Sequence, residues 1–205
     1  MTRLSQIEII PRWKEQYGLS TFVETGCYLG DGIATALAWG FECVFSCDLH
    51  PDHVEHCRRR FAEEIRSGRV AIFEGDSIAV LEGKILPAMG GPALIYLDAH
   101  FPAYYGLAEV GPSTRFPLRE ELDAIRRHRA GKAADVVLCD DMRVIESPDN
   151  PTFCRDLPRS LVVTEFGLDS LRNALPGTHE AVLLNVGESV LALLPVSQES
   201  LPFMS

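Results

Sequence analysis

The sequence lacks any long run of apolar residues and any excess of positive charge. No stretch of its 205 residues approaches the roughly 20 consecutive apolar residues of a membrane-spanning helix, and the start of the chain shows no signal-peptide pattern. We therefore expect no membrane partner and a cytoplasmic location. The formal net charge of −10 opposes binding to the phosphate backbone of a nucleic acid, so we expect no nucleic-acid partner either.

Signals for disulfides and for zinc are also missing. The six cysteines contain no CxxC pair, and most lie in apolar runs, where a reduced cysteine packs as a small hydrophobic residue. The nearest candidates for zinc ligands are His50, His53, His56 and Cys57. Their spacing does not match a closed tetrahedral site, and most of them fall in a charged, helix-forming stretch. We expect neither disulfides nor zinc.

What the sequence does contain is the alternation typical of an α/β fold. Its 205 residues, 46% of them hydrophobic, suit a single domain with a substantial core, here taken as 1–205. Short β-rich runs alternate with amphipathic segments, and several of the first five runs are almost continuously apolar, as in parallel strands covered on both faces. Only Gly187 and Glu188 separate the last two runs, which predicts an antiparallel hairpin. The predicted strands are 21–25, 43–49, 70–76, 93–100, 135–141, 180–186 and 189–196.

Helices and loops are predicted between these strands. The stretches 51–68 and 117–131 combine an apolar stripe with the charge pattern of capped helices, and the N-terminal segment 1–20 is also expected to be helical. The stretches 101–116 and 142–160 fit neither period and are rich in Pro, Gly, Ser or Asp, so they are predicted loops. Each follows an acidic strand end, where ligands bind in open α/β sheets, and both are therefore expected to contact the substrate. The apolar stripes consist of Val54, Cys57, Phe61 and Ile65 in the first helix and Leu118, Leu122 and Ile125 in the second.

Glycines and acids follow the first three predicted strands. The first runs into "VETGCYLGDG", whose glycines allow a ligand to approach backbone amides closely. The second ends at Asp48, where a carboxylate can accept hydrogen bonds from both hydroxyls of a ribose. The third ends in "EGDS", where Asp76 can accept a hydrogen bond from an adenine amino group. Taken separately, each acid fits a helix N-cap better, but the ordered series favours a nucleotide-containing cofactor.

With these motifs the sequence resembles the class I S-adenosylmethionine (SAM)-dependent methyltransferases over roughly residues 21–196. "VETGCYLGDG" is similar to their first cofactor motif, "CDL" to their ribose-binding acid and "GDS" to their adenine-side motif. Tyr28 stands where many members have a second glycine. The resemblance implies a single-domain Rossmann-like fold, with a mostly parallel seven-stranded sheet, a C-terminal antiparallel hairpin and helices on both faces. It also implies that SAM is bound by Glu24, Gly26, Tyr28, Gly30, Asp48, Asp76 and Ser77.

Three carboxylates follow the fourth and fifth predicted strands: Asp98, Asp140 and Asp141. Neighbouring strands lie about 4.8 Å apart, so these side chains can converge, and without a cation they would repel one another. All-oxygen ligation favours Mg²⁺, with Mn²⁺ or Ca²⁺ as alternatives, over zinc. The pattern is similar to that of the metal-dependent, macrocin-type small-molecule O-methyltransferases, in which acids after these strands hold the metal. Asp140 and Asp141 are alternatively the caps of a loop.

A histidine accompanies the first of these acids. In "ALIYLDAHF", Asp98 and His100 are two residues apart, so in an extended chain both would face one space. We predict that Asp98 and His100 are catalytic, with His100 as the general base, since a neutral imidazole accepts a proton near neutral pH. Two alternatives remain for His100: a further metal ligand, or a structural histidine hydrogen-bonded to the loop.

The sequence thus predicts a Mg²⁺-dependent and SAM-dependent O-methyltransferase that acts on a small hydroxylated acceptor such as a sugar or a phenol, with a homo-oligomer left open. Two other classes remain. A protein that has kept the cofactor pocket without chemistry would bind SAM and transfer no methyl group. A metal-dependent hydrolase of the ureohydrolase type also has "DAH" after a strand, but that motif continues with a further Asp where this chain has Pro102.

Overall fold

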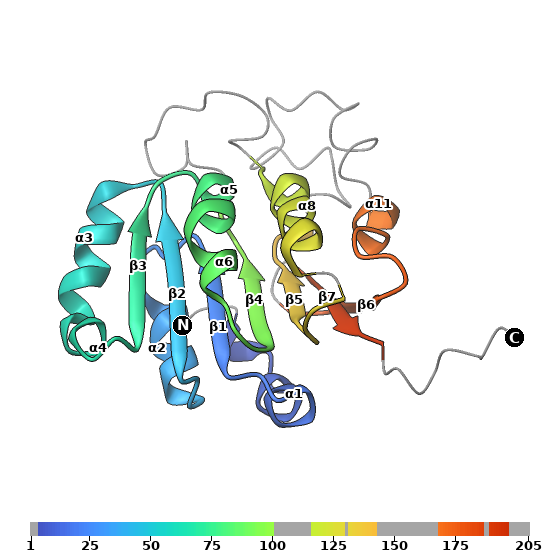
Figure 1. Ribbon diagram of the computed structural model, residues 1–205, viewed down its shortest axis with the longest axis horizontal. Helices are drawn as coiled ribbons and strands as arrows, with labels where there is room; N and C mark the ends of the chain where they lie inside the picture. Colours follow the sequence, from blue (N-terminus) through green and yellow to red (C-terminus); the bar gives the residue numbers. More distant parts are fainter. Residues whose placement is uncertain (1–3, 101–115, 130, 143–167, 187–188, 197–205) are drawn as a thin grey trace, which may run out of the picture.

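The computed structural model of the chain describes residues 4–100, 116–129, 131–142, 168–186 and 189–196. Its strands form one seven-stranded sheet with the order β3-β2-β1-β4-β5-β7-β6 (Figure 1). The strands are β1 (Thr21–Thr25), β2 (Cys43–Asp48), β3 (Val70–Glu74), β4 (Ala93–Leu97), β5 (Val136–Cys139), β6 (His179–Leu184) and β7 (Val190–Pro195). Every strand expected from the sequence is present.

The pairing of the strands matches the prediction. The first five strands are parallel, with β1 between β2 and β4, while β7 is antiparallel to both β5 and β6. The predicted hairpin of β6 and β7 is confirmed, although Gly187 and Glu188 lie outside the described residues. The chain reverses its direction of travel across the sheet between β1 and β4, and the carboxyl ends of parallel strands at such a point are where α/β proteins bind ligands.

Helices cover both faces of this sheet, as predicted (Figure 1). One core cluster packs α1, α2 and α3 against one face, and a second packs α5, α6, α8 and α11 against the other. The helical elements are η1 (Leu4–Gln6), α1 (Ile10–Tyr17), α2 (Asp31–Ala38), α3 (Pro51–Arg60), α4 (Ala62–Arg66), α5 (Ser77–Val80), the π-helical turn η2 (Leu81–Ile85), α6 (Leu86–Ala88), α8 (Leu118–Arg129) and α11 (Leu168–Arg172). No helix within these described ranges has the length and apolar character needed to cross a membrane.

The alternation of side chains along β1 assigns its residues to the two cores. Phe22 belongs to the cluster beneath α1, α2 and α3, whereas Val23 belongs to the cluster beneath α5 and α8. Successive side chains of a strand point to opposite faces of the sheet, so Glu24 shares the face of Phe22 and Thr25 shares the face of Val23. Both Glu24 and Thr25 are buried.

Two features differ from the sequence analysis or lie beyond the structure. The single helix predicted over 51–68 is divided at Phe61, whose φ of −112° is not helical. The backbone departs from the helix here because the buried ring of Phe61 packs against Gly30. The predicted loops 101–116 and 142–160 lie outside the described residues, apart from Phe116 and Met142. Both of these residues are buried.

A buried ion pair positions α8 on the sheet. The Arg129 guanidinium donates to both oxygens of Asp135, with nitrogen–oxygen distances of 2.9 and 2.8 Å. Arg129 also donates to the carbonyls of Met89 and Gly91, and the N–H of Ala93 donates to Asp135. These contacts join the end of α8 to the residues that precede β4 and β5. The first turn of α8 therefore lies at the opposite, carboxyl edge of the sheet (Figure 1).

Candidate functional site

The loop after β1 is held between the ends of two neighbouring strands. Gly26, Tyr28 and Gly30 have left-handed φ values of 86°, 42° and 81°. The N–H of Gly26 donates to the carbonyl of Cys47 at 2.9 Å. A Cβ atom at Gly26 would lie 2.5 Å from the carbonyl oxygen of Asp98, so only glycine combines this φ with this approach. The loop therefore joins the end of β2 to the end of β4.

The carboxylate of Asp48 is engaged by this loop and by the start of α3. It accepts hydrogen bonds from the N–H groups of Tyr28, at 2.9 Å, and His50, at 2.8 Å. His53 Nδ1 lies 3.3 Å from the same carboxylate. The imidazole of His53 stacks on His50 and meets the ring of Tyr28 edge-on. Asp48 thus lies at the strand end where the sequence predicts a ribose-binding acid, beside the predicted cofactor residue Tyr28.

Glu24 lies beneath the loop, not on its surface. Only 3% of the residue is exposed, and its carboxylate accepts a hydrogen bond of 2.9 Å from the Ser46 hydroxyl. A Cβ atom at Gly32 would come within 1.6 Å of Glu24 Oε1, so the carboxylate occupies the space that a side chain on α2 would take. Burial raises the pKa of the Glu24 carboxyl to about 8, and the Ser46 hydrogen bond partly offsets that rise. Glu24 therefore supports the glycine loop from below.

The acid after β3 has a structural role in this conformation. Asp76 accepts a hydrogen bond of 3.0 Å from the N–H of Ala79 and is the N-cap of α5, the alternative left open by its sequence position. Asp76 is half-buried, and Ser77, the first residue of α5, is buried. Both predicted adenine-side residues therefore lie at the carboxyl edge of the sheet, on the face covered by α5 and α8.

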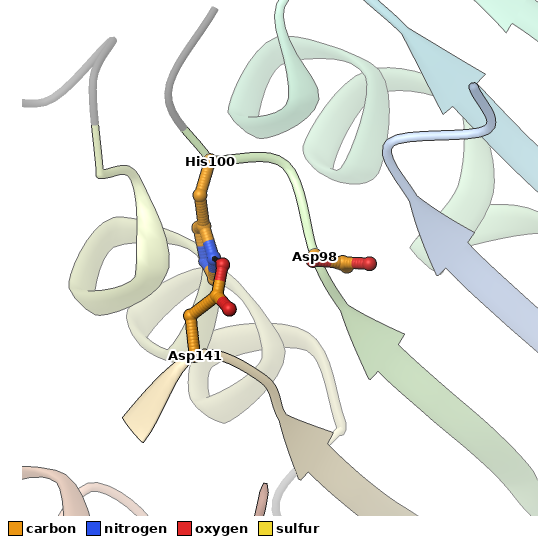
Figure 2. Close-up of side chains that lie close together, drawn as sticks. All are labelled: Asp98, His100 and Asp141. Atoms are coloured by element: carbon orange, nitrogen blue, oxygen red, sulfur yellow. Dashed lines mark ion pairs between the residues drawn. The ribbon is translucent and has the colours of Figure 1, made fainter. Parts of the chain in front are cut away.

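Asp98, His100 and Asp141 come together after β4 and β5. Each offers a ligand atom, and these atoms all lie within 4.8 Å of one another, the one such group of three or more found among the described residues. Figure 2 shows the imidazole of His100 facing the carboxylate of Asp141, with Asp98 beside them. His100 Nδ1 lies 3.5 Å from Asp141 Oδ2, and the imidazole packs against the ring of Phe116 at a centroid distance of 4.4 Å. His100 and Asp141 are 7% and 6% exposed.

Asp140 lies outside this group, although the sequence analysis placed it with Asp98 and Asp141. The hydroxyl of Tyr96 donates a short hydrogen bond to its carboxylate, which also accepts from the N–H of Asp141 at 2.6 Å. Burial and the negative charges of Asp98 and Asp140 raise the pKa of Tyr96. Both residues follow the end of β5 at Cys139. The carboxylate of Asp140 lies against Tyr96, whereas the left-handed φ of 59° at Asp141 turns that residue toward His100. The structure brings together Asp98, His100 and Asp141.

A further carboxylate, which the sequence analysis did not select, lies behind this group. Glu121 on α8 is fully buried, and neither of its oxygens has a hydrogen-bond partner at close geometry among the described residues. Burial raises the pKa of its carboxyl, while the His100 imidazole and the hydroxyls of Ser77 and Thr25 partly offset the rise. A signal was present in the sequence, because Glu121 follows Leu118 by three residues and therefore falls within the apolar stripe of this helix.

The donor set of Asp98, His100 and Asp141 fits a divalent cation. Two carboxylates held this close, one of them buried, repel each other unless a positive charge lies between them. The imidazole takes the place that the sequence analysis gave to a third carboxylate. Imidazole ligands suit first-row transition metals, whereas carboxylates suit Mg²⁺, Ca²⁺ and Mn²⁺. A mixed set of this kind therefore favours Mn²⁺ relative to Mg²⁺.

Comparisons with known proteins identify the fold. No protein-family model matches the chain, and no curated protein matches it. Solved structures do: an SAH-bound methyltransferase from Podospora anserina matches at 19% identity with a TM-score of 0.59, covering 96% of this chain and 80% of that one. An O-methyltransferase from Bacillus cereus in complex with SAH matches at 19% identity with a TM-score of 0.57, and the match covers 93% of this chain and 80% of that one. TomG from Streptomyces achromogenes, an O-methyltransferase of tomaymycin synthesis solved with SAM, matches at 16% identity with a TM-score of 0.58. That match covers 94% of this chain and 80% of TomG. The predicted methyltransferase fold is confirmed.

Proposed function

We propose that this chain is a SAM-dependent O-methyltransferase that acts on a small hydroxylated acceptor, such as a sugar or a phenol, with a divalent cation in its site. One observation carries the proposal. The carbonyl of Asp98 abuts Gly26, so the group Asp98, His100 and Asp141 adjoins the glycine loop at the carboxyl ends of β1 and β4. Methyl transfer requires a donor and an acceptor held roughly 3–3.5 Å apart, and two sites that adjoin each other support such an arrangement.

On the cofactor side, the roles follow the strand ends. When bound, SAM supplies a methyl group already activated by its sulfonium, so the protein needs to bind and align it. The loop from Gly26 to Gly30 would lie along the cofactor, with Asp48 accepting from its ribose hydroxyls and Asp76 and Ser77 at its adenine. The SAH- and SAM-bound structures with the same fold support this assignment.

On the acceptor side, the buried group provides a place to deprotonate a hydroxyl. A divalent cation held by Asp98 and Asp141 would lower the pKa of an acceptor hydroxyl and orient it. The acceptor oxygen attacks the methyl carbon, the carbon–sulfur bond breaks to leave S-adenosylhomocysteine, and the hydroxyl proton passes to a base. His100 is the general base in this proposal, and its alternative role is the third ligand.

The test is transfer of a labelled methyl group from SAM to a panel of sugars, phenols and catechols. The assay is run with excess EDTA and after restoring Mg²⁺ or Mn²⁺, and binding of SAM and Mn²⁺ is measured separately by calorimetry. We expect transfer to at least one hydroxylated acceptor, loss of transfer with EDTA and recovery with metal. Full activity in EDTA would disprove the metal requirement. SAM binding without transfer to any acceptor would favour the binding-protein alternative, and failure to bind SAM would contradict the proposal.

A His100→Ala variant separates the two roles of the histidine. The base role predicts a fall in turnover of roughly 100-fold or more, with the affinities for SAM and Mn²⁺ retained. The ligand role predicts that Mn²⁺ affinity falls with turnover. Unchanged turnover would exclude both roles.

A further inference from the structure

Glu121 occupies a position where a carboxylate is costly. It is 0% exposed, in the apolar face of α8 that also buries Leu118, Leu122 and Ile125 against the sheet. An ionised carboxylate in such a place loses its hydration, and neither oxygen regains a close hydrogen bond among the described residues. A leucine or a glutamine would fill the same volume at a lower cost. Stability alone therefore does not account for a glutamate here.

The groups around Glu121 belong to both halves of the site. Burial raises the pKa of the Glu121 carboxyl, and the imidazole of His100 and the hydroxyls of Ser77, at the start of α5, and Thr25, at the end of β1, partly offset the rise. The carboxylate of Asp76 repels that of Glu121 and raises its pKa further. Of these groups, His100 is the one that can carry a positive charge.

The residue that leads into α8 is packed directly against His100. Phe116, which precedes α8, packs against the imidazole in a tilted arrangement with ring centroids 4.4 Å apart. Thr25, at the end of β1, contacts the backbone of the residue that follows β4: its hydroxyl accepts a hydrogen bond of 3.2 Å from the N–H of Asp98. Glu121 thus lies where the ends of β1 and β4 and the start of α5 meet, beneath the site and closed off from solvent.

We propose that Glu121 is a positioning residue whose carboxylate orients the His100 imidazole and links it to the hydroxyls of Thr25 and Ser77. This inference rests on the proposed function, because His100 needs a defined orientation both as a base and as a metal ligand. In proteins, an imidazole that acts in either way is commonly oriented by a carboxylate that itself touches neither substrate nor metal. Asp141 faces the ring on the side of the proposed metal, and Glu121 is the carboxylate that comes from the helix.

The test uses two replacements of Glu121 and one control. Glu121→Gln removes the charge at constant shape, and Glu121→Leu removes every polar atom. Ile125→Val removes one methyl group from the same buried face of α8, one turn further from the site. We expect both Glu121 variants to keep the wild-type melting temperature or exceed it, and to bind SAM as the wild type does. We expect turnover, Mn²⁺ affinity or both to fall by roughly 10- to 100-fold, while Ile125→Val changes neither.

A readout in the metal-free protein separates this inference from the proposed function. The ring nitrogen resonances of His100, assigned by their loss in His100→Ala, should shift in Glu121→Leu and stay unchanged in Ile125→Val. If the wild type shows neither methyl transfer nor Mn²⁺ binding but the His100 resonances still shift in Glu121→Leu, the proposed function fails and the positioning contact stands. If the resonances do not shift, or if the Glu121 variants retain wild-type turnover and Mn²⁺ affinity, the inference is wrong. It is also wrong if both replacements unfold the protein, because Glu121 would then be a structural residue.

Discussion

The N–H of Tyr28 donates a hydrogen bond of 2.9 Å to the carboxylate of Asp48, across the ends of β1 and β2. This contact holds a residue with a left-handed φ of 42° in the middle of the glycine loop. Because His50 donates to the other oxygen of the same carboxylate, Asp48 sets the position of both the loop and the first turn of α3. Its role in cofactor binding is therefore expected to be direct, through the ribose, and indirect, through the loop.

Replacing Asp48 should weaken SAM binding. Asp48→Ala removes a charged acceptor for ribose hydroxyls and frees Tyr28, so the dissociation constant should rise by roughly 10- to 100-fold. Asp52→Ala, which removes an exposed carboxylate from the first turn of the same helix, is the matched control and should bind SAM normally. Calorimetry with SAM, and with NAD as a ligand that should not bind, gives the comparison. An unchanged affinity in Asp48→Ala would remove this residue from the pocket.

The contact between Gly26 and Asp98 should be sensitive to a single methyl group. Gly26→Ala places a Cβ atom 2.5 Å from the Asp98 carbonyl oxygen at a φ of 86°. Gly40→Ala imposes a similar φ, 76°, with nothing within 4 Å, so it isolates the cost of the backbone conformation. We expect Gly26→Ala to be less stable than Gly40→Ala by about 1–3 kcal/mol and to lose SAM affinity, which Gly40→Ala should keep. Equal behaviour of the two variants in urea unfolding and calorimetry would contradict this reading.

Glu24 should make the protein less stable as the pH rises. Its pKa is raised from 4.5 to about 8 in the folded protein, so between these values the unfolded chain releases a proton that the folded chain retains. The stability present below pH 4.5 is therefore lost progressively as the pH rises toward 8. Glu24→Gln keeps an acceptor for Ser46 and does not titrate. Relative to wild type it should gain on the order of 1–4 kcal/mol between pH 4 and 9.

The measurement for Glu24 is urea unfolding at several pH values across this window. All other titrating groups are common to wild type and variant, so the difference in unfolding free energy isolates Glu24. Glu74→Gln, at an exposed position at the end of β3, should show no such pH-dependent difference. A difference for Glu24→Gln that does not change with pH would show that Glu24 ionises at its ordinary pKa.

The two adjacent aspartates after β5 should respond differently to replacement. Asp141→Asn keeps the backbone, since asparagine tolerates the φ of 59°, and should weaken Mn²⁺ binding by roughly 10-fold or more. Tyr96→Phe leaves the buried Asp140 without its hydroxyl donor and should cost about 1–3 kcal/mol of stability while Mn²⁺ affinity stays near wild type. Paired calorimetry and urea unfolding distinguish these effects. Loss of Mn²⁺ binding in Tyr96→Phe would return Asp140 to the metal site.

The order and type of the elements could be predicted from local pattern, because each strand and helix carries its own periodicity. The apolar runs at 21–25 and 93–97 become β1 and β4, and the short connection between the last two strands requires the hairpin. The glycine loop and the acids Asp48 and Asp98 were likewise recognisable, since each stands at the end of such a run. The break at Phe61 was not predicted, because the helical stripe continues through it and only the contact with Gly30 requires the change.

The sequence by itself determined the fold and predicted a candidate site at the strand ends. Tertiary structure alone decided which side chains meet there. Asp140 and Asp141 are neighbours in the chain, but beyond the end of β5 the left-handed backbone of Asp141 turns it toward His100 while Asp140 contacts Tyr96. Glu121 is remote in sequence from Thr25 and Ser77, and the packing of α8 on the sheet brings its carboxylate toward their hydroxyls. The periodicity of the sequence predicts which face of a helix or strand a residue occupies. Which residues of different elements come into contact depends on how those elements pack together.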